Sequence, residues 1–307
     1  MIIVTGGSGF LGRAVAARLP DAVSLASTDL DLTSGDAVFE AFSEWRASVV
    51  VHLAARVGGI TENISRSADF LIDNLRIDAN VLNALRANPP EHFVPMLSTC
   101  MYPDQLSDDR YPMHEEDIEE GAPPPTNAAY AAAKRSLLHG TRALHDQYGV
   151  PYTAFIPANL YGPGDHFGEG KSHFLAASID RIEEARRTSR DSVEFFGTGR
   201  ALRQYVYVDD VAALIEAAVG RGPANAALNI APSENRSIRS LAETVAEVAG
   251  FDGAIGFDGV GPDGQIRKDV SADVLRATFP EWSAIETPFE RGVEQTIEWY
   301  RNNVEAS

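Results

Sequence analysis

The hydrophobic positions in the first half of the chain fall into short apolar runs separated by longer stretches with helical periodicity. The apolar runs predict strands over residues 2–5, 22–25, 49–55, 93–97 and 152–156. The periodic stretches, with the turn that opens the first of them, predict helices over 6–19, 36–45, 68–87 and 127–148. Strands that alternate with helices and are almost wholly apolar are typical of a parallel sheet covered on both faces. The pattern therefore predicts an α/β fold with a doubly wound parallel sheet.

Beyond Pro157 the pattern changes to turns and helices with few strands. Clusters of glycine, proline, asparagine and aspartate predict loops over 159–165 and 262–264. Further elements are predicted as helices over 173–187, 208–219, 241–248 and 290–304 and as one strand over 227–230. We expect a first domain over 1–165, to which residues 204–232 return, and a smaller α/β domain over 166–307.

The composition is that of an ordinary globular protein, with 307 residues, 44% hydrophobic and 23% charged. It excludes a disordered chain, a collagen and a coiled coil. The sequence enters its first predicted strand at once, with no basic and apolar leader, and it has no run of about 18 apolar residues. We therefore expect neither a secretory signal nor a spanning helix. A single cysteine, Cys100, excludes an intrachain disulfide and favours a reducing, cytoplasmic location.

The charge balance is acidic, with 26 basic and 44 acidic residues and a net charge of −18. This excludes a general nucleic-acid binder and disfavours an anionic membrane surface as partner. Only three of the basic residues are lysines, Lys134, Lys171 and Lys268. A coding preference for arginine explains this bias without any function, yet it makes each lysine a residue to examine.

The first strand leads directly into Gly6, Gly9 and Gly12 and then into a helix. Glycines at this spacing allow a tight turn, let a pyrophosphate approach the helix N-terminus and let the helix pack on the strand. Because the motif lies between strand and helix, it predicts a dinucleotide site rather than a plain glycine-rich turn. The end of the second strand offers no clear acidic or basic partner for the ribose, so it leaves NAD and NADP undecided. Asp31 and Leu32 are placed at the adenine edge.

Two further groups of residues suggest catalysis. Tyr130 and Lys134 are four apart on a predicted helix, so the phenol and the ammonium share a face, where the cation would favour the phenolate. The alternative is a solvated helix face. Ser98 and Cys100 follow the strand over 93–97, at the sheet edge where parallel folds bind ligands. Ser98 can donate to a carbonyl oxygen, whereas Cys100 is either a reactive thiol or a small buried apolar residue.

Together the glycine motif, Ser98, Tyr130 and Lys134 resemble the extended short-chain dehydrogenase/reductase superfamily. Longer stretches are similar to the GDP-L-fucose synthase family, at 54–60, 98–103, 159–165, 172–173 and 262–268. The resemblance covers nearly the whole chain. It implies a Rossmann domain over 1–165, a sugar-nucleotide domain over 166–307, and a homodimer formed through 68–87 and 127–148. It also implies 3,5-epimerisation and 4-keto reduction of GDP-4-keto-6-deoxy-D-mannose to GDP-L-fucose, and NADP(H) rather than NAD(H).

The resemblance also implies a role for each site residue. Cys100 as thiolate takes a proton from C3 or C5, and His173 returns one on the opposite face of the sugar. Ser98 and Tyr130 hold the enolate oxygen, and Tyr130, supported by Lys134, gives a proton during reduction. The cofactor-binding residues implied are Gly6, Gly9, Phe10, Gly12, Asp31, Leu32, Ala54, Ala55, Tyr130 and Lys134. The substrate-binding residues implied are Asn159, Arg181, Arg203 and Asp263. We predict no metal site.

Some positions keep alternatives open. Gln204 and Tyr207 differ from the residues common in the family, and only Arg13 offers a cation for a 2′-phosphate. Taken alone, His173 is equally typical of a surface residue, and Asn159 can equally cap the turn. A 4,6-dehydratase would need an acid pair where Cys100 and Met101 stand, and a simple 4-epimerase needs no thiol and imidazole. A 3,5-epimerase or 4-reductase of another keto-deoxy sugar nucleotide, and a non-catalytic cofactor-binding sensor, stay open.

Overall fold

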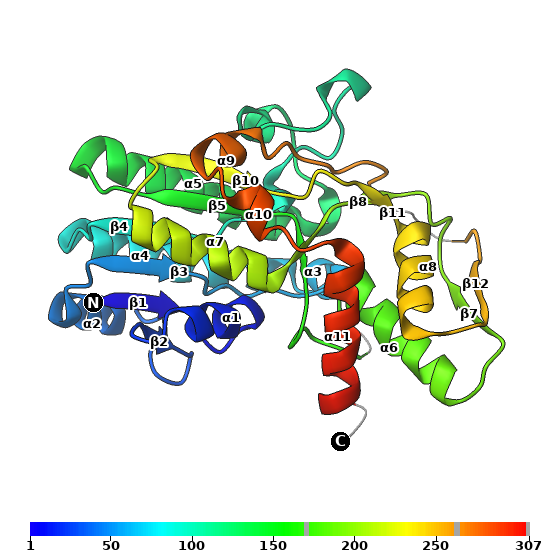
Figure 1. Ribbon diagram of the computed structural model, residues 1–307. Helices are drawn as coiled ribbons and strands as arrows, with labels where there is room; N and C mark the ends of the chain where they lie inside the picture. The colour runs from blue at the N-terminus through cyan, green and yellow to red at the C-terminus, as the bar shows by residue number, and fades with distance from the viewer. Residues whose placement is uncertain (169–171, 261–264, 305–307) are drawn as a thin grey trace.

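The computed structural model describes residues 1–168, 172–260 and 265–304 (Figure 1). Its main sheet is parallel and has the strand order β2-β1-β3-β4. These strands are β1 (Ile2–Thr5), β2 (Val23–Leu25), β3 (Val49–His52) and β4 (His92–Pro95). Isolated bridges from Phe93 to Tyr152 and from Met96 to Phe155 continue the sheet into β5 (Thr153–Pro157), which pairs in parallel with β10 (Ala226–Ile230). The predicted parallel α/β sheet is confirmed.

Helices cover both faces of this sheet, as predicted. The helices α1 (Phe10–Arg18) and α7 (Val208–Arg221) pack against each other on one face. The other face carries α2 (Gly35–Trp45), α4 (Ser67–Ala87) and α5 (Ala128–Tyr148). Between the layers lies one apolar core that includes Val4, Val51, Val94, Leu137 and Leu214. Burial on both faces explains why these strands are apolar throughout.

A second lobe extends from this sheet (Figure 1). Its helices are α6 (Phe174–Arg187), α8 (Ile238–Ala249) and α11 (Phe289–Asn303). Its strands β7 (Ser192–Phe195) and β12 (Ala254–Phe257) pair in parallel. A separate apolar core that includes Ile179, Phe195, Leu241 and Val293 holds the lobe together. The helices α9 (Asp273–Thr278) and α10 (Trp282–Ile285) instead place Leu275, Phe279 and Trp282 in the core of the main sheet.

Short elements escaped the sequence patterns. They are the elements β7, β12, α9 and α10 given above, the helix α3 (Ile60–Ser65), the strands β6 (Asn159–Tyr161), β8 (Leu202–Arg203), β9 (Tyr205–Tyr207) and β11 (Arg236–Ser237), and the 3-10 helices η1 (Thr99–Met101), η2 (Asp108–Arg110), η3 (Glu115–Glu119) and η4 (Pro125–Asn127). Two predicted strands also end earlier than expected, β3 at His52 and β4 at Pro95. The chain turns away after β1 at Gly6, whose φ is +74°, so β3 loses β1 as its pairing partner there, and β4 in turn loses β3. Ala54 and Ser98 therefore lie in the loops at the sheet edge.

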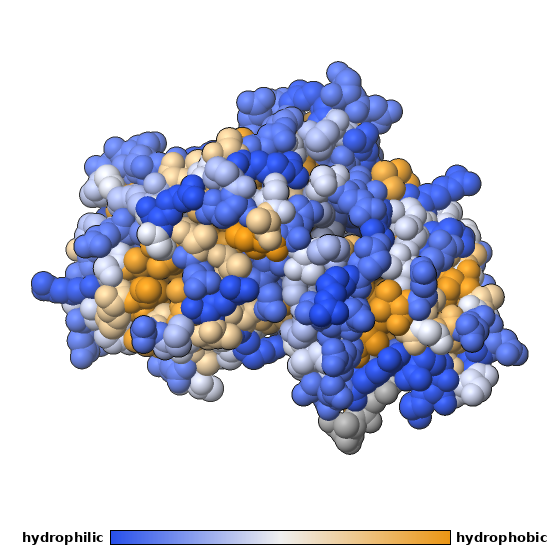
Figure 2. All heavy atoms as spheres, in the orientation of Figure 1, coloured by the Kyte–Doolittle hydropathy of each residue, from blue (hydrophilic) through white to orange (hydrophobic). Residues whose placement is uncertain are grey.

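Hydrophilic side chains cover most of the face in Figure 2, and apolar ones reach the surface beside α7 and between α8 and α11. No helix in the part of the chain that the structure describes is both long and apolar enough to cross a membrane.

Candidate active site

The glycine loop joins β1 to α1 with no room for side chains. A Cβ at Gly6 would lie 2.7 Å from the backbone nitrogen of Ala54, and one at Gly12 would lie 2.0 Å from the carbonyl oxygen of Gly6. Gly9 is the N-cap of α1 and provides no side-chain cap for the first N–H groups of the helix. The loop therefore offers backbone donors and a helix N-terminus to an anion, which is what the pyrophosphate of a dinucleotide requires. The structure thus places Gly6, Gly9, Gly12 and the helix start Phe10 at one loop.

At the expected adenine end, Asp31 is held by its own neighbour. Its carboxylate accepts hydrogen bonds from the N–H and the hydroxyl of Thr33, at 2.9 and 2.7 Å, and these bonds lower the pKa of Asp31. The side chain of Leu32 is packed in the sheet core, so only its backbone faces outward. Arg13 donates to the carbonyl oxygens of Ser8 and Gly164, both at 2.6 Å. A 2′-phosphate at Arg13 would compete with these two carbonyls.

Ser98 and Cys100 lie in the loop that follows β4, where η1 begins. The hydroxyl oxygen of Ser98 accepts a hydrogen bond from the backbone N–H of Cys100 at 3.1 Å. This bond leaves the Ser98 proton free to be donated to a carbonyl oxygen. Arg135 of α5 fixes the loop, because its guanidinium donates to the carbonyl oxygens of Met101 and Gly121.

The Cys100 thiol is half-buried rather than packed in the core. Two nitrogen donors face its sulfur: Nδ2 of Asn127 at 3.0 Å and Nζ of Lys268 at 3.7 Å. An apolar filler residue would not attract two polar donors, one of them charged. The surroundings thus favour the reactive thiol over the small buried apolar residue.

Tyr130 and Lys134 both lie on α5 as predicted, and Lys134 is only 2% exposed, which rules out the solvated helix face. The prediction that the lysine favours the phenolate of Tyr130 is wrong. Burial, followed by the charges of Cys100 and Asp78, raises the pKa of Tyr130 well above its usual value. Burial and nearby negative charge both disfavour the charged phenolate of Tyr130. Tyr130 is therefore held protonated, as a proton donor.

His173 is the N-cap of α6 and is exposed as a residue. Partial burial of its ring, followed by the charges of Lys268 and His166, lowers the pKa of His173. Lys268 thus acts on both His173 and the sulfur of Cys100. Ser98 and Tyr130 thus lie close to Cys100, and Lys268 links this group to His173, although the residues come from separate parts of the chain.

The predicted substrate-binding residues are less closely grouped. The half-buried guanidinium of Arg203 donates to the carbonyl oxygens of Leu202 and Gln265, both at 2.7 Å, and burial lowers the pKa of Arg203. Arg181 is exposed. It donates to the carbonyl oxygen of Glu194 at 2.6 Å and lies over the ring of Phe195, so β7 engages it.

The remaining two substrate positions differ in what the structure describes of them. Asn159 opens β6, and its Nδ2 donates to the carbonyl oxygen of Gln204 at 3.0 Å. This bond joins β6 to the segment before β9. Asp263, together with Lys171, lies outside the described residues.

The two departures from the family pattern have positions inside the protein. Gln204 is buried, and its amide donates to the carbonyl oxygens of Pro232 and Val270 and accepts from the N–H of Val270. Tyr207 packs in the core of the second lobe. Both side chains therefore hold segments together.

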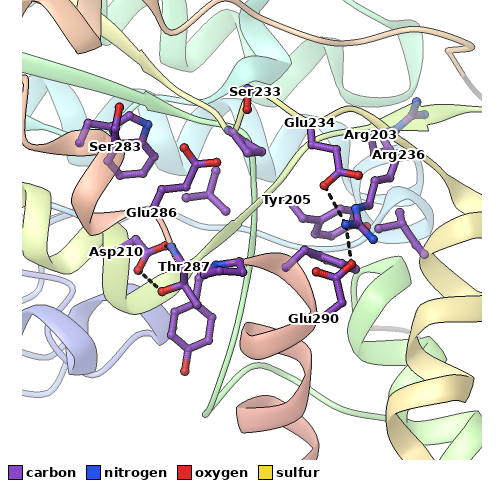
Figure 3. A pocket seen from close by; sticks show the side chains of 17 residues that line it. Arg203, Tyr205, Asp210, Ser233, Glu234, Arg236, Ser283, Glu286, Thr287 and Glu290 are labelled. Atoms are coloured by element: carbon purple, nitrogen blue, oxygen red, sulfur yellow. Dashed lines mark hydrogen bonds and ion pairs between the residues drawn. The ribbon is translucent and has the colours of Figure 1, made fainter.

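A pocket of about 270 Å³ opens near Arg203 (Figure 3). Glu234 and Glu290 flank Arg236 there, and Asp210 bonds to Thr287. Of the predicted site residues, its described lining includes Arg203 alone. The predicted residues Ser98, Cys100, Tyr130 and His173 are therefore not part of this pocket.

Sequence reasoning missed two residues of the cluster, Asn127 and Lys268. The scarcity of lysines marked Lys268 as worth examining, but no local pattern linked it to Cys100. Asn127 stood only at the start of a predicted helix. Within residues 1–168, 172–260 and 265–304, no three histidine, cysteine, aspartate or glutamate side chains are grouped so that they could hold a metal ion.

Comparison with known proteins shows which family and which proteins this chain is similar to. Residues 2–231 match the NAD dependent epimerase/dehydratase family. The chain is 32% identical to the GDP-L-fucose synthase of Escherichia coli K12, covering 98% of this chain and 97% of that one. It is 30% identical to the Dictyostelium discoideum GDP-L-fucose synthase, covering 100% and 97%. The crystal structure of a GDP-L-fucose synthetase from Naegleria fowleri bound to NADP superimposes with a TM-score of 0.88 at 31% identity, covering 100% of this chain and 94% of that one.

Proposed function

Because this chain belongs to the NAD-dependent epimerase/dehydratase family and, within it, to the GDP-L-fucose synthases, we propose that it converts GDP-4-keto-6-deoxy-D-mannose to GDP-L-fucose. The reaction has two parts, epimerisation at C3 and C5 and reduction of the 4-ketone. The observation that carries the proposal is that the thiol of Cys100 has the serine hydroxyl and the protonated phenol beside it and shares Lys268 with the imidazole of His173.

Epimerisation needs one group that removes a proton and another that returns it from the other face. The 4-ketone acidifies the hydrogens on C3 and C5, since the resulting enolate carries its charge on oxygen. The Cys100 thiolate takes the proton and becomes a thiol, and the imidazolium of His173 gives a proton to the opposite face and becomes neutral. Ser98, whose proton is free, and the protonated Tyr130 donate hydrogen bonds to the enolate oxygen.

Reduction uses the other half of the cluster. When bound, the reduced nicotinamide supplies hydride to C4. Tyr130 gives its phenol proton to the carbonyl oxygen, and the ammonium of Lys134, one helical turn away on α5, offsets the negative charge that the phenol acquires. The thiol and the imidazole serve the inversion, whereas the phenol and its lysine serve the reduction.

The described residues fit a dinucleotide, and the cofactor is NADP(H) by relationship to the NADP-bound structure. The glycine loop offers an N-terminus with no side-chain cap, and side chains there would collide with backbone atoms. No carboxylate of the described residues pairs with the buried Lys134. Gly6, Gly9, Phe10 and Gly12 would hold the pyrophosphate, and Lys134 the nicotinamide ribose. Ala54 and Ala55, which follow β3 beside the loop, would line the cofactor together with Asp31 and Leu32.

For the sugar nucleotide we propose Arg203 and Asn159 as contacts, with Arg181 and Asp263 as further positions of the family pattern. Arg203 is supported by its position at the junction of β8 and the segment 265–270. The division into a cofactor domain over 1–165 and 204–232 and a sugar-nucleotide domain over 166–307 is supported by the two separate apolar cores, except that α9 and α10 pack in the core of the cofactor domain.

Two further points concern the cellular form. We propose a homodimer through α4 and α5, which lie side by side on one face and expose Ile72 to 48%. We also propose a reducing compartment such as the cytoplasm, because the reaction requires Cys100 as a free thiol. Light scattering on the purified protein would test the first point.

The decisive experiment incubates the full-length protein with a panel of 4-keto-6-deoxy sugar nucleotides and with NADPH or NADH, and identifies the product sugar. We expect GDP-L-fucose from the GDP-4-keto-6-deoxy-D-mannose reaction, with NADPH consumed in equal amount. Faster turnover of another nucleotide sugar would move the assignment to that substrate. Cofactor binding without consumption across the panel would favour the non-catalytic sensor.

A further inference from the structure

The sulfur of Cys100 lies between two hydrogen-bond donors that come from distant parts of the chain. Asn127, at the end of η4, approaches with Nδ2 at 3.0 Å, and Lys268 approaches with Nζ at 3.7 Å. An ammonium group has only donors, so the sulfur is the acceptor in its contact with Lys268. A thiolate accepts such bonds far better than a thiol, because a charged acceptor strengthens them.

Lys268 is held in place by the segment that carries it, residues 265–270, which we call the strap. Nε2 of Gln265 donates to the carbonyl oxygen of Pro103 at 3.2 Å, so the strap is fixed to the loop that contains Cys100. The N–H of Met113 donates to the carbonyl oxygen of Asp269 at 2.9 Å. The position of the ammonium is therefore set by the fold.

The charge of Lys268 is also left unneutralised by its neighbours. The adjacent Arg267 forms a bidentate ion pair with Asp269, in which Nε and Nη2 of the arginine donate to Oδ1 and Oδ2 at 2.7 and 2.9 Å. No carboxylate among the described residues lies within ion-pair distance of Lys268. Its charge therefore acts on the groups that face it, the sulfur of Cys100 and the imidazole of His173.

The charged and titratable groups around the sulfur come from three elements. Tyr130 on α5 faces Cys100, and its pKa is raised first by burial and then by the charge of Cys100, so the phenol stays protonated there. His173 at the start of α6 is under the influence of Lys268. Lys268 from the strap is the cation of this group. Its positive charge attracts negative charge on the sulfur, and it makes a protonated His173 a stronger acid that gives up its proton more readily.

We propose that Lys268 and Asn127 are positioning residues that hold Cys100 as a thiolate, ready to remove the proton from the sugar ring. The inference rests on the proposed function in taking Cys100 as the base, and it adds the residues that keep this sulfur available in its anionic form. Lys268 supplies the positive charge that faces the sulfur, and the hydrogen bond from Asn127 fixes the orientation of the sulfur. Asn127 also has a buried Oδ1 with no partner among the described residues, so its amide keeps one acceptor available beside the sulfur.

The first test measures alkylation of the full-length protein by iodoacetamide between pH 5 and 10, followed by intact mass. Cys100 is the only cysteine, so each alkylated molecule reports this sulfur. We expect Lys268→Met to react about tenfold more slowly than wild type at pH 7 and equally fast at pH 10, a shift of about one pH unit. Lys268→Arg should keep most of the wild-type profile. Arg267→Gln, a matched control on the strap, should keep all of it.

The second test follows solvent deuterium entering C3 and C5 of the GDP keto sugar. In Lys268→Met we expect kcat for exchange to fall at pH 7 and to recover as the pH rises, with reduction of an already epimerised ketone unchanged. Asn127→Leu should show a smaller shift in the same direction, and it replaces the lysine variant if that one does not fold. A raised KM with an unchanged pH profile would overturn the proposal and show that Lys268 binds the phosphates instead.

The two proposals fail in different ways. If Cys100→Ser exchanges deuterium normally, Cys100 is not the base and the proposed mechanism is wrong, whatever the alkylation shows. If Cys100→Ser abolishes exchange but Lys268→Met keeps the wild-type alkylation profile, the base assignment survives and the role of Lys268 is refuted.

Discussion

His92 gives the sharpest stability prediction, because it is buried at the start of β4 with one partner. The ring is 3% exposed, its Nε2 shares a 2.9 Å hydrogen bond with the hydroxyl of Thr153, and its Nδ1 has no partner among the described residues. Burial lowers the pKa of His92 from 6.5 to about 4. A protonated ring would carry an unpaired N–H and a charge into the core, so the folded protein keeps the ring neutral.

The sign and size follow from proton linkage. In the unfolded chain His92 takes up a proton below pH 6.5, whereas in the folded protein it does so only near pH 4. The contribution of neutral His92 to the free energy of unfolding is therefore present above pH 6.5 and is lost as the pH falls toward 4. At pH 5 the lost free energy of unfolding amounts to about 2 kcal/mol. His92→Gln retains a hydrogen-bonding group for Thr153 and removes the titration.

The assay is urea denaturation at pH 7 and pH 5 for wild type, His92→Gln and His139→Gln. His139 is an exposed histidine of α5 and serves as the matched control. Between the two pH values, we expect His92→Gln to lose about 2 kcal/mol less than wild type and the control to behave like wild type. Equal losses in wild type and His92→Gln would refute the reasoning.

Three further predictions concern the site. Gly12→Ala places a Cβ 2.0 Å from the carbonyl oxygen of Gly6, so we expect at least about tenfold weaker NADPH binding by calorimetry. Gly220→Ala, at an open position, should bind normally, and a similar loss there would point to general destabilisation. Cys100→Ser should slow solvent exchange at C3 and C5 about a hundredfold or more and leave reduction of an epimerised ketone intact. Tyr130→Phe should reduce the ketone about a hundredfold more slowly yet still exchange deuterium, and full reduction by this variant would contradict its role as proton donor.

The main sheet could be predicted from sequence because its signals are local. Apolar runs, helical periodicity and the glycine spacing each fall within about twenty residues. Most of the strands that the sequence did not predict are two or three residues long, β7 and β12 have four, and the pairing of all of them is fixed by distant partners. Asn159 pairs with Tyr205, and Leu202 pairs with Ser237. A strand of this length has too few residues to show an alternation of its own.

The same distinction applies to the site. Ser98 and Cys100 were predictable because they follow a strand, and Tyr130 and Lys134 because they are four apart on one helix. The contact between Lys268 and Cys100 spans 168 residues and depends on the strap crossing the loop after β4. The protonation of Tyr130 was also mispredicted, since burial and two facing acidic groups are properties of the folded protein.

The two halves of the proposed reaction are linked through the charge on Cys100. While the sulfur is a thiolate, its charge helps to keep the pKa of Tyr130 high, so the phenol donates a hydrogen bond without losing its proton. When the sulfur takes a proton from the sugar, that charge disappears at the moment when negative charge develops on the enolate oxygen. Tyr130 then becomes a stronger acid and a better donor to that oxygen. As a thiolate, Cys100 thus keeps Tyr130 from losing its proton early, and protonation of Cys100 removes this effect. The thiol, the phenol and Lys268 therefore act as one electrostatic unit.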